Sequence, residues 1–170
     1  VTGGGDSYFI VETVKNKLGL NPLLVNYNSH YNTKIGIRNL ANLSTVFDCD
    51  IVSSTINPTL VKKITRYTLK KYGNIYWHVL AGYLTFPVQV AVKFRIPLIV
   101  WGENPQNENG GPLYKEDNHI LDRSWLEEFG GLLGLRTTDI SDLMSIKQEK
   151  LYFYTYPTNE EIEKNNSIGI

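Results

Sequence analysis

The chain opens with Val1-Thr2-Gly3-Gly4-Gly5-Asp6-Ser7, and this stretch decides the fold that we expect. Three consecutive glycines let a backbone turn tightly and bring bare N–H groups close to a ligand. Apolar residues then recur at helical spacing over residues 10–18, so the turn leads into a helix N-terminus, whose unpaired N–H groups and positive dipole end attract anions. The pattern predicts a phosphate-binding loop in which Asp6 or Ser7 caps the helix, and the Thr2 and Ser7 hydroxyls donate to phosphate oxygens.

A glycine turn closed by a capping residue is also ordinary chain punctuation, so the loop alone does not establish phosphate binding. It is not a Walker loop, because no Gly-Lys-Ser/Thr follows at the required spacing. The stretch instead resembles the Ser-Gly-Gly-x-Asp-Ser signature of the PP-loop ATP pyrophosphatases. Thr2 stands where that signature has its first serine, so the hydroxyl is kept.

Composition sets the class of protein. The 170 residues, 42% of them hydrophobic, are enough for one domain with a core. Seventeen Lys and Arg balance seventeen Asp and Glu, which argues against nucleic acid or an anionic membrane as a partner but leaves local charged patches open. The single Cys49 excludes an internal disulfide and a Cys-x-x-Cys pair. With no apolar run of roughly twenty residues, we expect a soluble cytoplasmic protein.

The rest of the pattern alternates strands with helices. We expect strands over residues 22–27, 51–56, 96–101 and 151–156, and shorter helical patterns over residues 122–129 and 140–147 and after residue 158. Other helices begin at Thr33, at Pro58 and near Thr85, the last because Pro87 suits an early helix position. Alternating strands and helices predict a Rossmann-like three-layer α/β/α fold with a mostly parallel sheet.

Residues 1–170 are expected to form a single ATP-binding domain with a less regular part over residues 105–170. The chain begins inside its motif, so we expect a piece of a longer protein without its flanking regions. The third helix carries a cluster of basic residues that could suggest a nucleic-acid surface, although we favour a solvated helix face. These residues are Lys62, Lys63, Arg66, Lys70 and Lys71.

Ligands of parallel sheets bind beyond the carboxyl ends of the strands. Three polar segments are therefore expected to converge, namely the glycine loop, residues 27–29 and residues 102–104. In this interpretation the loop holds phosphates, Tyr27 and Asn28 meet the adenine or ribose, and the segment of Gly102 and Glu103 supplies an acid. Arg38 and Thr85 are weaker phosphate candidates, and the three histidines share no metal-ligand spacing.

Four longer stretches, residues 21–25, 33–40, 85–93 and 96–104, resemble the N-acetyl sugar amidotransferases in the expected order. These are PP-loop enzymes of bacterial surface-polysaccharide synthesis, including lipopolysaccharide O-antigen. The resemblance implies conversion of an acetamido group of a sugar, expected to be nucleotide-linked, into an acetamidino group. The amide oxygen attacks the α-phosphorus of ATP, pyrophosphate leaves, and ammonia from a glutaminase partner displaces AMP.

Residue roles follow from these expectations. Gly3, Gly4, Gly5 and Ser7 would cradle the pyrophosphate. Asp6 would cap the helix, orient the loop or help to hold Mg²⁺. Glu103 would bind Mg²⁺ or take a proton from ammonia, and its plain alternative is a solvated carboxylate after a strand. The sequence leaves the sugar, the glutaminase and homo-oligomer formation open.

The chain also departs from the family. Gly5 stands where the amidotransferases usually carry Lys, which removes a cation that would neutralise phosphates, and cysteines common near the family's Trp are absent around residues 76–78. A nucleotide-binding or interaction domain that has lost catalysis is therefore an alternative. A PP-loop sulfurtransferase that thiolates tRNA is another, although the lone Cys49 and the neutral charge argue against it.

Overall fold

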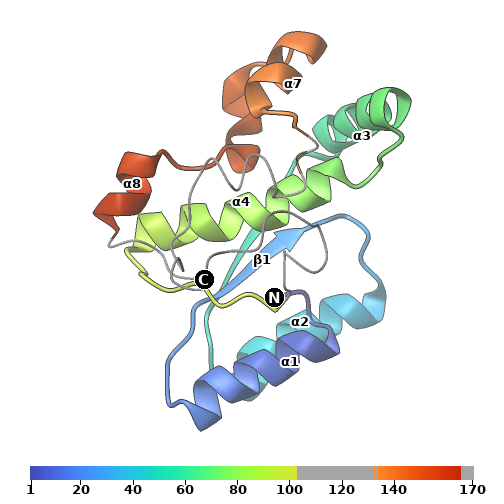
Figure 1. Cartoon of the computed structure of the whole chain (residues 1–170). Helices are drawn as coiled ribbons and strands as arrows, with labels where there is room; N and C mark the ends of the chain where they lie inside the picture. Colours follow the sequence, from blue (N-terminus) through green and yellow to red (C-terminus); the bar gives the residue numbers. More distant parts are fainter. Residues whose placement is uncertain (103–131, 133, 166–170) are drawn as a thin grey trace. The chain divides into compact units, whose positions relative to one another are not determined.

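The computed structural model describes residues 1–102, 132 and 134–165 (Figure 1). Its contacts group into two compact units, Val1–Thr55 and Ile56–Ile170. The chain is mixed α/β and mostly helical, and the described residues include one two-stranded parallel sheet. Two predicted features, the helix over residues 122–129 and the acid Glu103, lie outside the described residues.

The first unit is a strand–helix–strand unit preceded by a helix. Helix α1 (Gly5–Glu12) continues as the π-helix η1 (Thr13–Lys17) and is followed by strand β1 (Leu24–Asn28), helix α2 (Lys34–Phe47) and strand β2 (Ile51–Thr55). The two strands pair in parallel, with Leu24 opposite Ile51 and Asn28 opposite Thr55. A helix joins them because parallel strands need a long crossover. The predicted parallel pairing is thus confirmed for these two strands.

Local signals set the boundaries of this unit. Gly19 adopts a φ of +67° just after the first helical segment, as expected of a glycine that ends a helix. Thr33 caps α2, with its Oγ1 accepting a hydrogen bond from the Gly36 N–H at 3.0 Å. The sequence predicts Gly19 as a C-terminal stop and Thr33 as a helix cap, and both boundaries are confirmed.

Helices α1 and α2 lie side by side and pack on the same face of the strands (Figure 1). The core between them consists of Val11, Leu24, Leu43, Phe47 and Cys49. The sequence predicts an apolar stripe on α2 formed by Ile37, Leu40, Leu43, Val46 and Phe47. This prediction is only partly confirmed, because Ile37 and Val46 are exposed. They lie to either side of the narrow face that Leu43 and Phe47 bury, so the helix covers less of the core than its sequence allows.

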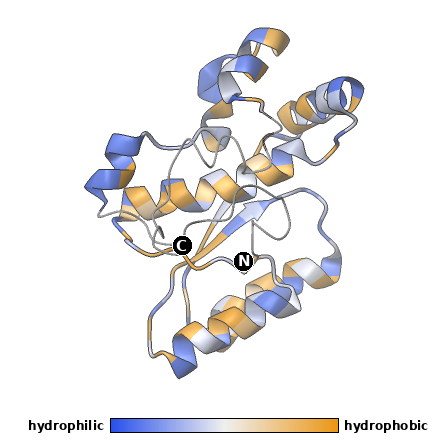
Figure 2. Cartoon of the chain, viewed as in Figure 1, coloured by the Kyte–Doolittle hydropathy of each residue, from blue (hydrophilic) through white to orange (hydrophobic). Residues whose placement is uncertain are grey.

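The second unit is helical in its described part. It contains α3 (Pro58–Tyr72), α4 (Trp77–Phe94), α7 (Thr137–Met144), the 3₁₀ helix η2 (Gln148–Tyr154) and α8 (Asn159–Lys164). Helix α4 is apolar along most of its length (Figure 2) and buries side chains on several faces. Asn57 caps α3, and Thr158 caps α8 as its sequence predicts, since the side-chain oxygen of each accepts a backbone N–H of the first turn.

Three predictions for this unit are wrong. Helix α4 begins at Trp77 and not near Thr85, so Pro87 lies inside it. Residues 96–101 form no strand, and only Leu98 makes an isolated β-bridge. The aromatic stretch near residue 151 belongs to η2. Each segment has strand-like or helix-start residues, but tertiary packing around α4 overrides these local preferences.

Helices α3 and α4 are joined by a turn in which Gly73 takes a φ of +66°. Among the helices that the structure describes, none is by itself long and apolar enough to cross a membrane. In the described part of the chain, α3 and α4 taken together have the length and apolar composition of a membrane span, but the chain bends by 120° between them.

Candidate nucleotide-binding site

The glycine loop enters the first unit alongside β1. The Val1 nitrogen donates to the Val25 carbonyl at 2.7 Å, and the Asn26 side-chain amide donates to the Val1 carbonyl at 2.8 Å. Asn26 is buried, and a buried amide needs such a partner. These bonds hold the start of the loop against the strand that ends at Asn28.

Gly3 forms the bend of the loop. Its φ is +79°, and a Cβ built there would lie 2.8 Å from the Leu40 nitrogen and 3.2 Å from the Gly36 carbonyl oxygen, both in the backbone of α2. Only glycine tolerates both the backbone conformation and this close approach. Gly3 is therefore required by the packing of the loop against α2, whether or not it also touches a ligand.

Helix α1 begins without a side-chain cap. Gly4 is the N-cap residue in extended conformation, and it provides no side-chain cap to the first turn. The prediction that Asp6 or Ser7 caps the helix is wrong, because both lie inside its first turn, where their own N–H groups are among those that need an acceptor. Gly4, Gly5 and Asp6 are exposed, so this end of the helix is open to an anion.

Ser7 and Thr2 close the loop on itself. The Thr2 N–H donates to Ser7 Oγ at 3.0 Å, and the two hydroxyl oxygens are 3.5 Å apart. Ser7 is buried. Its oxygen is thus engaged in shaping the loop, while Thr2 is exposed at the loop surface.

The residues at positions 5 and 6, Gly5 and Asp6, decide what the loop can bind. A Cβ added at Gly5 would meet no atom of the described residues within 4 Å, so among these residues the space beside it is open. Asp6 places a negative charge on the first turn, which stabilises the helix but repels a phosphate unless a cation lies between them.

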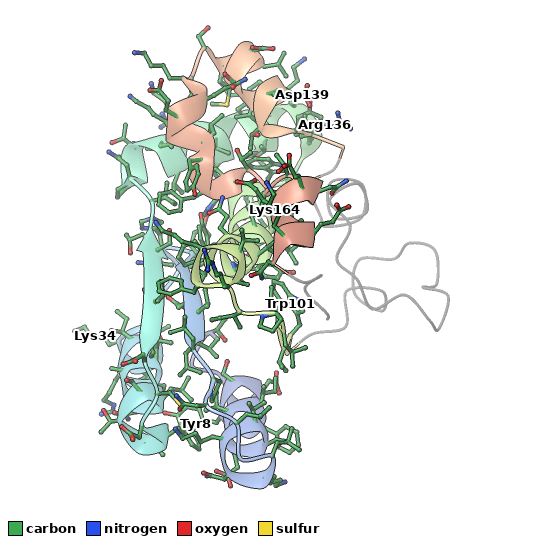
Figure 3. The ribbon with its side chains drawn as sticks, turned by 90° about the vertical axis from the view of Figure 1, so that its left-hand side faces the viewer. Tyr8, Lys34, Trp101, Arg136, Asp139 and Lys164 are labelled. Carbon is green, nitrogen blue, oxygen red and sulfur yellow. The ribbon has the colours of Figure 1, made fainter. Side chains whose placement is uncertain are left out.

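Tyr8 fastens α1 to α2 behind the loop (Figure 3). Its hydroxyl donates to the Asn39 carbonyl at 2.9 Å, and its ring meets the Phe47 ring edge-on at a centroid distance of 5.9 Å. Lys34, at the first position of α2, points outward from the unit (Figure 3). The two helices behind the loop are therefore held together by both polar and aromatic contacts.

The carboxyl end of β1 carries the second predicted segment. Asn28 Oδ1 accepts from the His30 N–H at 2.9 Å and from the Asn32 amide at 2.7 Å. Its Nδ2 donates to Thr55 Oγ1 at the end of β2 at 3.2 Å. Asn28 thus ties the tips of both strands to the following turn, in which His30 takes a φ of +66°. Tyr27 is buried.

The other predicted site residues are divided between the two units. Arg38 is an exposed residue of α2 in the first unit. Thr85 belongs to the second unit, is 0% exposed inside α4, and its hydroxyl has no hydrogen-bond partner within the described part of the chain. Gly102 is exposed in the second unit. The loop, Tyr27, Asn28 and Arg38 therefore share one unit, and Glu103 lies outside the described residues.

Sequence reasoning missed Asn26 and Tyr8, which position the loop. The signal for Asn26 was present, because an amide inside an otherwise apolar strand must find a partner when it is buried. Tyr8 gave no comparable signal, since its hydroxyl bonds to a backbone carbonyl 31 residues away in the sequence.

A scan against protein-family models finds no match to this chain, and a search of curated proteins finds no significantly similar sequence.

Proposed function

We propose that the first unit binds the phosphates of ATP at the glycine loop, as part of an ATP-dependent amidotransferase of the PP-loop class. The observation that carries the proposal is the N-terminus of α1, which lacks a side-chain cap and follows a glycine bend held against α2. Exposed N–H groups at a helix N-terminus bind phosphate through both hydrogen bonds and the helix dipole.

In this proposal each loop residue has a distinct task. Gly3 sets the bend, and the N–H groups around Gly5 face the leaving pyrophosphate, where they stabilise the charge that develops on it. The Thr2–Ser7 contact keeps the loop in shape before ATP arrives. Such preorganisation matters because donors already in place cost no reorganisation during the reaction.

Mg²⁺ fits this site through Asp6. Among the described residues there is no group of three or more His, Cys, Asp or Glu that could hold a metal ion. Mg²⁺ needs no such group, because it is commonly held by one or two carboxylates together with substrate phosphates and water. Asp6 would supply the carboxylate, and the ion would neutralise phosphate charge next to it.

The reaction and its partners are inferred from the resemblance of residues 21–25, 33–40, 85–93 and 96–104 to the N-acetyl sugar amidotransferases. The substrate is then an N-acetyl sugar, and the ammonia comes from a glutaminase subunit. The three-layer arrangement of that class is part of the same proposal. In it β1 and β2 belong to a larger parallel sheet, and their crossover helix α2 covers one face of that sheet.

A nucleotide-binding module without catalysis is the second candidate, and Gly5 favours it. The amidotransferases usually carry Lys at this position, and a glycine leaves the open space beside the first turn without a cation. Loss of a charge-assisted hydrogen bond to phosphate weakens binding by roughly 1.5–3 kcal/mol. Such a protein would bind ATP weakly and release no pyrophosphate.

Pyrophosphate release tests the proposal. The full chain is mixed with ATP, Mg²⁺, a nucleotide-linked N-acetyl sugar and ammonium. Pyrophosphate is expected only when ATP, Mg²⁺ and the sugar are present, and its release should continue beyond one turnover only with ammonium, which displaces AMP. Asp6→Ala should abolish release. ATP binding, measured in parallel by calorimetry, separates the candidates, because binding without pyrophosphate supports the module and no binding contradicts both.

A gain-of-function variant sharpens the test. Gly5→Lys restores the missing cation in open space, so we expect about tenfold tighter ATP binding. Asn16→Lys adds the same charge at the exposed far end of the same helical segment and should leave the affinity within about twofold. Equal affinities of the two variants would show that the triphosphate lies away from the loop.

A further inference from the structure

Helix α3 concentrates positive charge. It carries five basic residues and no acidic one, and all five basic side chains are exposed: Lys62, Lys63, Arg66, Lys70 and Lys71. The whole chain has a net charge of zero, so the charge is local. A basic helix face is usually only solvated, and a second feature is needed to indicate a partner.

The second feature is a group of exposed apolar side chains at the carboxyl end of the same helix. Leu69 is 51% exposed, Tyr72 is 42% exposed, and Ile75 in the following turn is 37% exposed. Together with Lys70 and Lys71 they form what we call the α3–α4 tip. Exposed apolar side chains next to lysines at a helix end are the combination that membrane-surface helices use.

The tip has a defined shape. Gly73 and Asn74 donate their N–H groups back to the carbonyls of Leu69 and Thr68 at 3.0 and 3.3 Å. The Tyr72 ring packs edge-on against the Tyr67 ring at a centroid distance of 6.2 Å. The turn also joins two helices at a 120° bend, so the tip forms a corner between α3 and α4 (Figure 1).

We propose that the α3–α4 tip docks this protein onto anionic lipid bilayers. Lysines next to a bilayer are attracted to anionic headgroups, and their stems can extend along the surface. Leu69 and Ile75 enter the boundary between headgroups and acyl chains, where Tyr72 has a favourable position for its amphipathic ring. The site is peripheral, because neither helix is long and apolar enough to span a membrane alone.

The composition of the tip favours lipid over the two other anionic partners. A nucleic acid would bind the lysines through its phosphates and stack a base on the Tyr72 ring. It offers no apolar phase for aliphatic side chains such as Leu69 and Ile75. Acidic proteins are less suitable because lysine is depleted in protein–protein interfaces. A bilayer surface can bind lysines, aliphatic side chains and a tyrosine ring together. This docking is independent of any activity at the glycine loop.

Vesicle co-sedimentation of the full chain tests the proposal. The probe is a vesicle of equimolar phosphatidylcholine and phosphatidylglycerol, with pure phosphatidylcholine as the neutral comparison. We expect binding to the anionic vesicles only, and weaker binding at high salt because the charges are screened. Lys70→Glu/Lys71→Glu should reduce the partition coefficient at least tenfold.

Two further variants complete the design. Lys93→Glu/Arg95→Glu makes the same charge change at exposed basic residues at the opposite end of α4 and should keep at least half of the binding. Leu69→Ser/Ile75→Ser keeps every charge and should also reduce binding at least tenfold, with circular dichroism confirming that the helices persist. The proposal is overturned if the native chain does not bind, if Leu69→Ser/Ile75→Ser binds normally, or if the native chain prefers RNA to vesicles.

Discussion

The two units differ in how closely their elements follow local sequence. In the first unit, α1 begins after Gly4, η1 ends before Gly19, and α2 runs from the Thr33 cap to Asp48. The two strands of this unit have the predicted positions to within two residues. In the second unit, the long helix α4 passes through a proline and is held by residues far away in sequence, such as Tyr152 and Tyr154. Local sequence signals therefore predict the boundaries of the elements in the first unit better than those of a helix such as α4, which is buried by tertiary contacts.

The largest effect should come from the anchor of the second unit. Trp77 is 0% exposed, donates its Nε1–H to the Leu132 carbonyl at 2.9 Å, and packs on the Tyr154 ring at 5.6 Å. Trp77→Ala should lower the free energy of unfolding by about 3–5 kcal/mol, because it removes this ring from a packed core. Hydrogen exchange should show the loss of protection mainly in α4.

Trp101→Ala is the matched control, since that indole is only partly buried and meets the Tyr83 ring at 6.5 Å. It should cost much less. If both variants lose the same stability, or if protection falls equally in α1 and α4, the second unit does not depend on Trp77 as described.

A smaller effect is expected at the bend of the first unit. Gly3→Ala would force an L side chain into a φ of +79° and to within 2.8 Å of the Leu40 nitrogen. We expect a loss of about 2–4 kcal/mol, from backbone strain and overpacking, with exchange protection lost mainly in α1 and α2. Gly5→Ala should be neutral or stabilising, because its Cβ meets open space in a helix. A neutral Gly3→Ala would contradict the close packing.

The smallest effect is expected when Pro87 of α4 and Pro58 of α3 are each replaced with alanine. Pro87 lies inside α4, whereas Pro58 is at the start of α3. Pro87→Ala restores a backbone N–H in the helix interior, so we expect a gain of about 1 kcal/mol or more in the free energy of unfolding. Pro58→Ala should change it little, since that N–H has no helical partner. Thermal unfolding of the two variants compares them, and a loss of stability with Pro87→Ala would contradict an interior position.

Much of the first unit could be predicted because its information is local. The Thr33 cap, the Gly19 stop and the apolar run of β1 act within a few residues of the boundary that they set. The second unit was predicted less well, because Pro87 is unfavourable inside a helix and residues 96–101 have a strand-like composition. Neither preference decides the outcome when α4 buries side chains on several faces.

For the candidate site, the sequence indicated the loop but not the task of each residue. Three glycines looked equivalent, yet Gly3 packs on α2, Gly4 precedes the helix, and Gly5 faces open space. Asn28 was expected to meet a ligand, but its side chain joins the tips of both strands to the next turn. Such differences depend on contacts across about 30 residues of chain, which periodicity does not report.

The contact between Gly3 and the backbone of α2 has a mechanical consequence. Because no side chain separates the two backbones, the loop cannot shift towards an occupant without moving Gly36 and Leu40. The same helix begins after the turn that Asn28 organises. An anion held at the loop would therefore also restrain Gly36 and Leu40, and with them the first half of α2.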